Sequence, residues 1–207
     1  TASRTPQQAQ ERGDTCSIAC LGKRVSLFYF RDVPRHDAAN IVSYLKKNGY
    51  PVCMLTGDHR ISAENTARLL GIDEVFYDLT PDNKLSKIQE LAKSRQIMMI
   101  GDGINDAPAL AQATVGIAMG EAGSATAIEA ADVVLLNQGL SSLPWLIDKA
   151  KKTRRIVSQN LALALAIILF ISGPASMGVI PLWLAVILHE GGTVIVGLNA
   201  LRLLKNT

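Results

Sequence analysis

The sequence has few cysteines, and its first residues are not expected to be a secretory leader; both observations narrow the class of protein. Its three cysteines, Cys16, Cys20 and Cys53, are too few for a disulfide framework, so we expect the soluble part in a reducing compartment. Cys16 and Cys20 lie four residues apart, and we interpret them as small buried residues rather than as a metal site. Residues 1–13 are polar and contain no apolar core of a signal peptide.

Charge is missing from residues 156–188, which contain no Asp, Glu, Lys, Arg or His. A transmembrane helix needs ~20 apolar residues, so this stretch is long enough to span a membrane. We predict two membrane helices, at about 157–176 and 182–204, with Gly173 and Pro174 disturbing the first. Backbone left bare in lipid is costly, so the pair is expected to pack against other helices or protein in the lipid bilayer.

The charges beside these segments predict their orientation. The net charge is only +3, and this mild excess does not indicate a nucleic-acid partner. Basic residues gather before the first apolar stretch and after the second: Lys149, Lys151, Lys152, Arg154, Arg155, Arg202 and Lys205. Because Lys and Arg favour the cytoplasmic side, both ends of the helix pair and the soluble domain are predicted to be cytoplasmic.

The first 150 residues alternate between strand and helix patterns. Strands are expected at 14–20, 24–31, 51–55, 74–77, 96–101, 114–118 and 133–136, and helices at 38–45, 62–70, 82–94, 106–112 and 124–131. This alternation predicts an α/β domain with a mostly parallel sheet covered by helices.

Two short motifs in this domain suit phosphate chemistry. Thr56-Gly57-Asp58 follows an expected strand, and a hydroxyl at the carboxyl end of a parallel strand is well placed to contact a phosphoryl oxygen. The alternative is a polar turn that caps the next helix. Lys84 stands at an expected helix start, where a cation can neutralise the charge of a transferring phosphoryl group. The alternative is a solvated surface lysine.

A third motif, Gly-Asp-Gly-Ile-Asn-Asp-Ala-Pro at 101–108, follows the apolar strand expected at 96–101. Asp102, Asn105 and Asp106 place two carboxylates and an amide within five residues. Such oxygen ligands suit Mg²⁺, and the glycines permit close approach of the backbone. The alternative is an Asx-rich turn that caps a helix.

The fourth motif, His189-Glu190-Gly191-Gly192-Thr193, lies inside the second expected membrane helix. Charged groups there cost at least ~2.5–3.5 kcal/mol and usually mark an ion path. Imidazole and carboxylate ligands suit Zn²⁺, Co²⁺ or a similar divalent ion, and Thr193 is a further polar contact. The two glycines allow close helix packing. The alternative is a satisfied polar pair at a helix interface.

In this order the motifs strongly resemble those of the P-type ATPases. The Thr-Gly-Asp tripeptide, the lysine of Pro-Asp-Asn-Lys and the string Gly-Asp-Gly-Ile-Asn-Asp-Ala-Pro-Ala-Leu carry the resemblance, which covers nearly the whole chain from about residue 14. His-Glu-Gly-Gly-Thr is similar to the heavy-metal branch associated with cobalt, zinc and other divalent ions. The resemblance implies a haloacid dehalogenase-like phosphorylation domain, ATP as substrate, and a transported Zn²⁺, Co²⁺ or Cd²⁺.

The resemblance also implies roles for the phosphate-site residues, which are Thr56, Gly57, Asp58, Lys84, Asp102, Asn105 and Asp106. Thr56 would contact the phosphoryl oxygens, and Lys84 would pair with the phosphoryl charge. Asp102 would bind Mg²⁺ with the support of Asn105 and Asp106. His189 and Glu190 would belong to the transmembrane metal path.

The sequence departs from this family where it lacks the nucleophilic Asp of an Asp-Lys-Thr-Gly-Thr string, the nucleotide-binding and actuator domains, and the earlier membrane helices. We therefore expect a C-terminal portion of such a pump, in a bacterial inner membrane or a plasma membrane. Residues 1–13 would be a linker from the nucleotide-binding domain, 14–150 the end of the phosphorylation domain and 151–207 the membrane segment. Without the nucleophile's strand the sheet would keep two open edges, so the isolated chain is expected to aggregate.

Two other interpretations stay open. The chain is a non-catalytic remnant or split-gene fragment that works only with a partner, or it is a membrane-anchored phosphatase of the haloacid dehalogenase class. The phosphatase needs its own nucleophilic Asp at a strand end. The nearest candidate, Arg31-Asp32-Val33-Pro34, lacks the accompanying hydroxyl or second acid.

Overall fold

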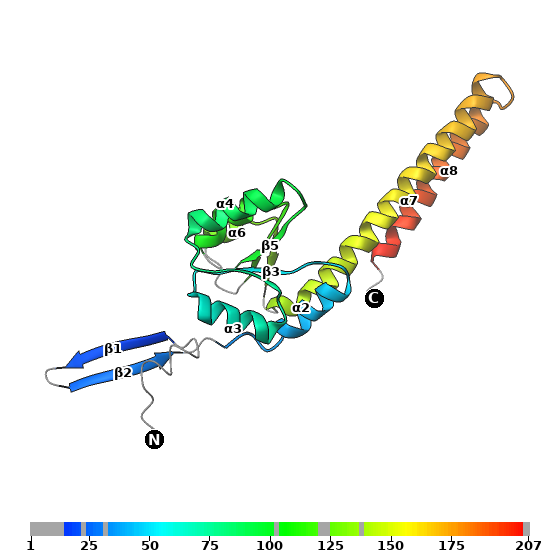
Figure 1. Cartoon of the computed structure of the whole chain (residues 1–207). Coiled ribbons are helices and arrows are strands. Elements are labelled where there is room, and N and C mark those ends of the chain that lie inside the picture. The colour runs from blue at the N-terminus through cyan, green and yellow to red at the C-terminus, as the bar shows by residue number, and fades with distance from the viewer. Residues whose placement is uncertain are drawn as a thin grey trace. The chain divides into compact units, whose positions relative to one another are not determined.

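A computed structural model (Figure 1) describes residues 15–21, 24–30, 33–101, 104–119, 125–136 and 139–204. The chain divides into two compact units, Thr1–Pro144 and Trp145–Thr207. The expected linker at 1–13, Asp102, Lys205 and the side chain of Cys16 lie outside what the structure describes.

The first unit begins with a two-stranded hairpin of β1 (Thr15–Leu21) and β2 (Arg24–Phe30). The strands are antiparallel, with Thr15 opposite Phe30, which confirms the two expected strands. Cys20 is exposed, so the expectation that it is buried is wrong. Side chains on both faces of the hairpin are exposed where they are described, with Ala19 and Ser26 on one face and Cys20 and Val25 on the other, so nothing there covers Cys20.

The rest of the first unit alternates helices and strands, which confirms the predicted α/β fold. Its elements are α2 (Ala38–Lys47), β3 (Cys53–Leu55), α3 (Arg60–Leu70), β4 (Glu74–Phe76), α4 (Pro81–Ala92), β5 (Met98–Gly101), η1 (Ile104–Asp106), α5 (Ala107–Gln112), β6 (Val115–Met119), α6 (Ala125–Ala130), β7 (Val133–Leu135) and η2 (Gly139–Ser142). In Figure 1, α4 and α6 lie on one side of the labelled strands, and α3 lies on the other.

The strands form two parallel pieces. β3 pairs with β4, and β5, β6 and β7 form a three-stranded sheet in that order. Among the strands that the structure describes, β3 and β5 each pair with one neighbour and not with each other. The edge of β3 away from β4 and the edge of β5 away from β6 are therefore open, as expected for a sheet that lacks a strand between them.

The core of the three-stranded piece positions the carboxyl end of β5. Leu110 of α5 and Ala118 of β6 are buried there, with Met99 among the partly buried residues packed against them. α5 approaches β6 so closely that a Cβ on Gly116 would lie 2.5 Å from the carbonyl oxygen of Leu110. Only glycine fits at this position. The close contact holds α5 against β6, and α5 begins directly after the polar loop that follows β5.

The second unit contains α7 (Leu143–Ser176, whose first two residues belong to the first unit), α8 (Leu182–Ala200) and η3 (Leu201–Leu203). Both long helices are apolar and long enough to cross a membrane, and they run side by side as a hairpin (Figure 1). Asn199 Nδ2 donates a hydrogen bond to Asn160 Oδ1 across the pair, at 2.7 Å. α7 continues through Pro174 and ends at Ser176, where the sequence predicts its end. A proline inside a helix removes one backbone hydrogen bond, so the disturbance expected at Gly173 and Pro174 stays a prediction.

Candidate functional site

The loop after β3 holds Thr56, Gly57 and Asp58 in a tight turn. The amide of Thr56 donates to Phe76 O at 2.9 Å, which continues the pairing of β3 with β4. The amide of Asp58 then donates to Thr56 Oγ1 at 3.1 Å. A hydroxyl can accept and donate at once, so Thr56 keeps its O–H for another acceptor.

A second loop, between β4 and α4, is tied to the first. The amide of Leu79 donates to Thr56 O at 3.1 Å, and the amide of Asp78 donates to Asp58 O at 2.9 Å. Asp78 has φ +52°. Among the residues that the structure describes, it is the only non-glycine residue with a positive φ. His59 Nδ1 lies 2.7 Å from Asp78 Oδ1. These contacts fix the Thr56 turn relative to the start of α4.

Sequence reasoning missed both His59 and Asp78. The sequence signal for Asp78 is weak, because an aspartate shortly before Thr80-Pro81 looks like an ordinary loop residue ahead of a helix. Aspartate is among the few residues that adopt the left-handed conformation readily, since its short side chain can bond locally. His59, next to Asp58 in sequence, carried no signal of its own.

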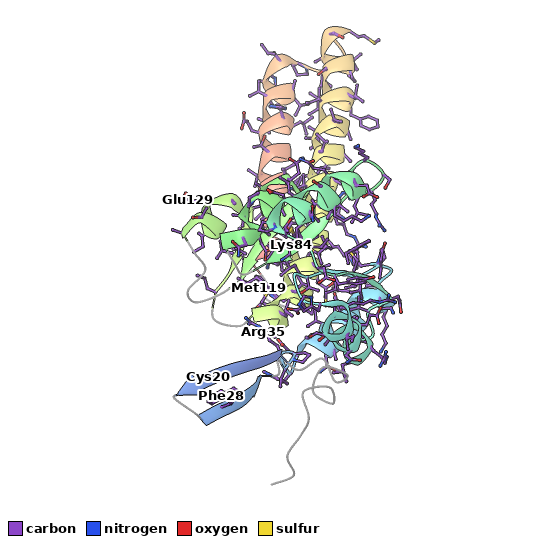
Figure 2. The ribbon with its side chains drawn as sticks, turned by 60° about the vertical axis from the view of Figure 1, so that its left-hand side comes forward. Cys20, Phe28, Arg35, Lys84, Met119 and Glu129 are labelled. Atoms are coloured by element: carbon purple, nitrogen blue, oxygen red, sulfur yellow. The ribbon has the colours of Figure 1, made fainter. Side chains whose placement is uncertain are left out.

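Lys84 lies in the first turn of α4 and reaches Asp106 at the end of η1 (Figure 2 labels Lys84). Thr80 caps the helix, since its side chain accepts from the amide of Asn83. Lys84 Nζ donates to Asp106 Oδ1 at 2.9 Å, and the two side chains are only 17% and 16% exposed. Burial of this degree makes the attraction stronger than that of a surface pair. The contact joins a cation and a carboxylate from separate elements beside the carboxyl end of β5.

The free bonding capacity of this pair suits a phosphoryl group and a hard cation. An ammonium has three donors, and Lys84 uses one of them on Asp106. Asp106 Oδ1 accepts that bond, which leaves Oδ2 as an acceptor, and Asn105 is exposed beside it. Mg²⁺ uses one or two carboxylates and keeps several waters, so this donor set fits Mg²⁺. Asp102, the third predicted ligand, lies outside the described residues.

Thiol chemistry does not belong to this site. Cys53 begins β3, and burial raises the pKa of its thiol, with the negative charge of Glu74 adding to the rise. A raised pKa leaves little thiolate at neutral pH, and the thiolate is the reactive form.

In the second unit the predicted cation ligands lie on α8. His189, Glu190 and Thr193 are exposed on this helix pair, whereas Gly192 is buried against Ile167 of α7. Glu190 stands two residues before Gly192, so helical geometry turns its side chain away from α7. Within residues 15–21, 24–30, 33–101, 104–119, 125–136 and 139–204, no group of three or more His, Cys, Asp or Glu is arranged to hold a metal ion.

Comparison with known proteins defines the class. The pattern of haloacid dehalogenase-like hydrolases matches residues 4–114, and the chain belongs to this family. Within that class its relatives are heavy-metal P-type ATPases. A probable cadmium/zinc-transporting ATPase of Arabidopsis thaliana, HMA1, is 43% identical over 88% of this chain and 23% of its own length. A probable cadmium-transporting ATPase of Listeria monocytogenes is 40% identical over 88% of this chain and 26% of its own.

The fold agrees with a solved relative. The crystal structure of a zinc-transporting PIB-type ATPase in the E2.Pi state matches with a TM-score of 0.86 and 36% identity, over 96% of this chain and 33% of that one. The chain thus spans about a quarter to a third of the proteins it matches.

Proposed function

We propose that this chain is part of an ATP-driven pump for divalent heavy-metal cations, of the Zn²⁺, Co²⁺ or Cd²⁺ type. The pump works through an aspartyl phosphate whose carboxylate lies outside this chain. That carboxylate attacks the γ-phosphorus of ATP, ADP leaves, and water later releases phosphate. The contact between Lys84 and Asp106 supports the proposal, because it holds a cation with spare donors beside a carboxylate with a spare oxygen.

Each residue contributes a defined interaction to this reaction. The O–H of Thr56, left over after its oxygen accepts from Asp58, donates to a phosphoryl oxygen. Lys84 donates its remaining N–H groups to another phosphoryl oxygen, and Asp106 orients the ammonium. Asp106 and Asn105, together with Asp102, would hold Mg²⁺, which offsets phosphate charge when it is bound. The open edges of β3 and β5 accommodate the strand that carries the nucleophile.

The membrane half supplies part of the cation path. A carboxylate in the apolar part of a membrane faces protein or a water-filled cavity rather than lipid. Glu190 is exposed on the helix pair, on the side away from α7, and this favours further helices that pack there and complete the ligand set. His189 and Thr193 contribute from the same stretch of α8.

The test is metal-stimulated ATP hydrolysis by the full-length protein in lipid vesicles, with Zn²⁺, Co²⁺, Cd²⁺ and Cu⁺ offered in turn. Divalent ions are expected to stimulate hydrolysis more than Cu⁺. Glu190→Gln should abolish the stimulation but leave phosphorylation by inorganic phosphate intact. Lys84→Ala should lower phosphorylation itself by about 10²–10³-fold, the usual loss when a charge-stabilising donor is removed.

A matched control separates these effects from general damage. Lys47→Gln removes an exposed lysine from α2, far along the chain from the site, and should change neither readout. Hydrolysis at one steady rate, with or without any transition metal, would contradict the proposed function.

A further inference from the structure

A cavity of about 300 Å³ lies at the start of α7, and neither proposed site uses it. Trp145, Asp148, Lys149 and Lys152 line it. These residues recur at intervals of three and four, so they share one face of the helix. Lys149 and Lys152 are half-buried, whereas the cations on the other faces, such as Lys151 and Arg154, are exposed.

The cavity lies beside the end of the second membrane helix. Lys149 Nζ donates to the carbonyl oxygen of Leu203 in η3 at 2.6 Å. Lys152 precedes the charge-free stretch at 156–188 by four residues, which is ~6 Å along a helix. The polar headgroup layer of a bilayer is about 5–8 Å thick on each side. Lys152 therefore stands at headgroup level when the apolar stretch spans the membrane.

The charges around the cavity favour an anion that also carries hydroxyls. Residues 145–155 contain five cations and one acid, Asp148, so their net charge is 5 − 1 = +4. Clusters of four to eight Lys or Arg on the cytoplasmic side of a membrane helix typically attract anionic lipids. Asp148 in the lining disfavours a bare anion. It instead suits a headgroup whose hydroxyls can donate to the carboxylate while its phosphate accepts from the lysines.

We propose that this cavity binds the headgroup of an anionic phospholipid of the cytoplasmic leaflet. The headgroup is of the phosphatidylglycerol type, with a phosphodiester for Lys149 and Lys152 and free hydroxyls for Asp148. Trp145, whose indole is amphipathic, also lines the cavity and is 57% exposed. The proposal rests on the membrane placement of α7 and α8 in the proposed function.

The chain supplies matched variants for the test. Lys152→Gln removes a cation from the cavity, whereas Lys151→Gln and Arg154→Gln remove the same charge from other faces of α7 at similar depth. The full-length protein is placed in bilayer nanodiscs of phosphatidylcholine with increasing phosphatidylglycerol, and bound phosphatidylglycerol is counted by native mass spectrometry. Lys152→Gln should weaken phosphatidylglycerol binding about fivefold, which is the usual contribution of one lysine near a membrane surface. The two control variants should weaken it much less. Lys152→Arg should bind like the unaltered protein.

Three results would overturn the site. Equal losses in all three glutamine variants would show diffuse attraction rather than a cavity. Displacement of the lipid by inorganic phosphate would show that free phosphate is the ligand. Equal binding of phosphatidylcholine and phosphatidylglycerol would show no headgroup preference. Metal-stimulated ATP hydrolysis, measured on the same samples, distinguishes the two proposals, because it persists if only the lipid site is wrong.

Discussion

Close packing of α7 and α8 depends on one glycine of a neighbouring pair. A Cβ added to Gly192 would lie 2.5 Å from Ile167 Cδ1 and 3.0 Å from Ile167 Cγ2. Carbon atoms in contact prefer about 3.5–4.0 Å. Gly191, the preceding residue, has no such neighbour within 4 Å. The same substitution is therefore predicted to disturb the helix packing at Gly192 but not at Gly191.

The expected size of the effect follows from that overlap. Gly192→Ala must move Ile167 or the whole of α7 by roughly 1 Å to restore normal contact. Rotation about χ2 can move Cδ1 away, but an isoleucine in a helix keeps one χ1 rotamer almost always, so Cγ2 stays 3.0 Å from the new methyl unless α7 shifts. Overpacking of this kind typically costs about 1–3 kcal/mol. Gly191→Ala meets nothing within 4 Å in the helix pair and replaces a poor helix former, so we expect no loss in the packing of α7 against α8.

The assay is thermal unfolding of the full-length protein in detergent, for the two single variants and for a double-mutant cycle. Ile167→Ala alone should destabilise the protein because it removes packing. Combined with Gly192→Ala, it should cost less than the two single losses added together, since the alanine methyl then occupies the vacated space. The reasoning is refuted if Gly191→Ala and Gly192→Ala lower the unfolding midpoint equally, or if the two substitutions simply add.

Two further predictions concern the first unit. Asp78→Ala should lower stability by about 1–2 kcal/mol more than Asp78→Gly, because alanine is strained at φ +52° whereas glycine is not; equal losses in thermal unfolding would assign the effect to the His59 contact instead. Cys20 should react with a thiol reagent at pH 8 much faster than Cys53, because Cys20 is exposed and burial raises the pKa of Cys53. Mass spectrometry of the labelled peptides gives the two rates, and equal rates would contradict the partial burial of Cys53.

Local sequence patterns were enough to predict most of the elements. The strands at β5 and β6 and the helix α4 are apolar or amphipathic segments with clear ends, and Thr80 and Pro81 mark the start of α4 at the expected place. Cys20 shows where local rules fail. Its spacing from Cys16 favoured burial, but its exposure depends on whether other elements pack on the hairpin.

The contacts of the candidate site needed the structure. Pattern alone placed Lys84 and Asp106 at the starts of two separate helices, 22 residues apart, and their 2.9 Å contact is a consequence of how α4 packs beside η1. Asp78 was not found at all, because its importance lies in a backbone angle and in amide bonds to the Thr56 turn, neither of which depends on a recognisable motif. Such contacts depend on tertiary packing rather than on local spacing.

Each of the two candidate sites lacks a partner, and the two missing partners carry opposite charges. At the phosphate site, Thr56 and Lys84 are donors with spare N–H or O–H groups, beside strand edges on β3 and β5 that pair with no described strand. On α8, Glu190 is an acceptor exposed where lipid would leave it unsolvated. Spare donors suit an anionic partner, whereas a carboxylate in lipid needs a cation or a water-filled cavity. Leaving Glu190 against lipid would cost at least ~2.5–3.5 kcal/mol. Supplying the missing cytoplasmic domains, with a strand that carries a phosphorylatable acid, but no further membrane helices should therefore restore phosphorylation without any metal dependence, whereas metal dependence requires both.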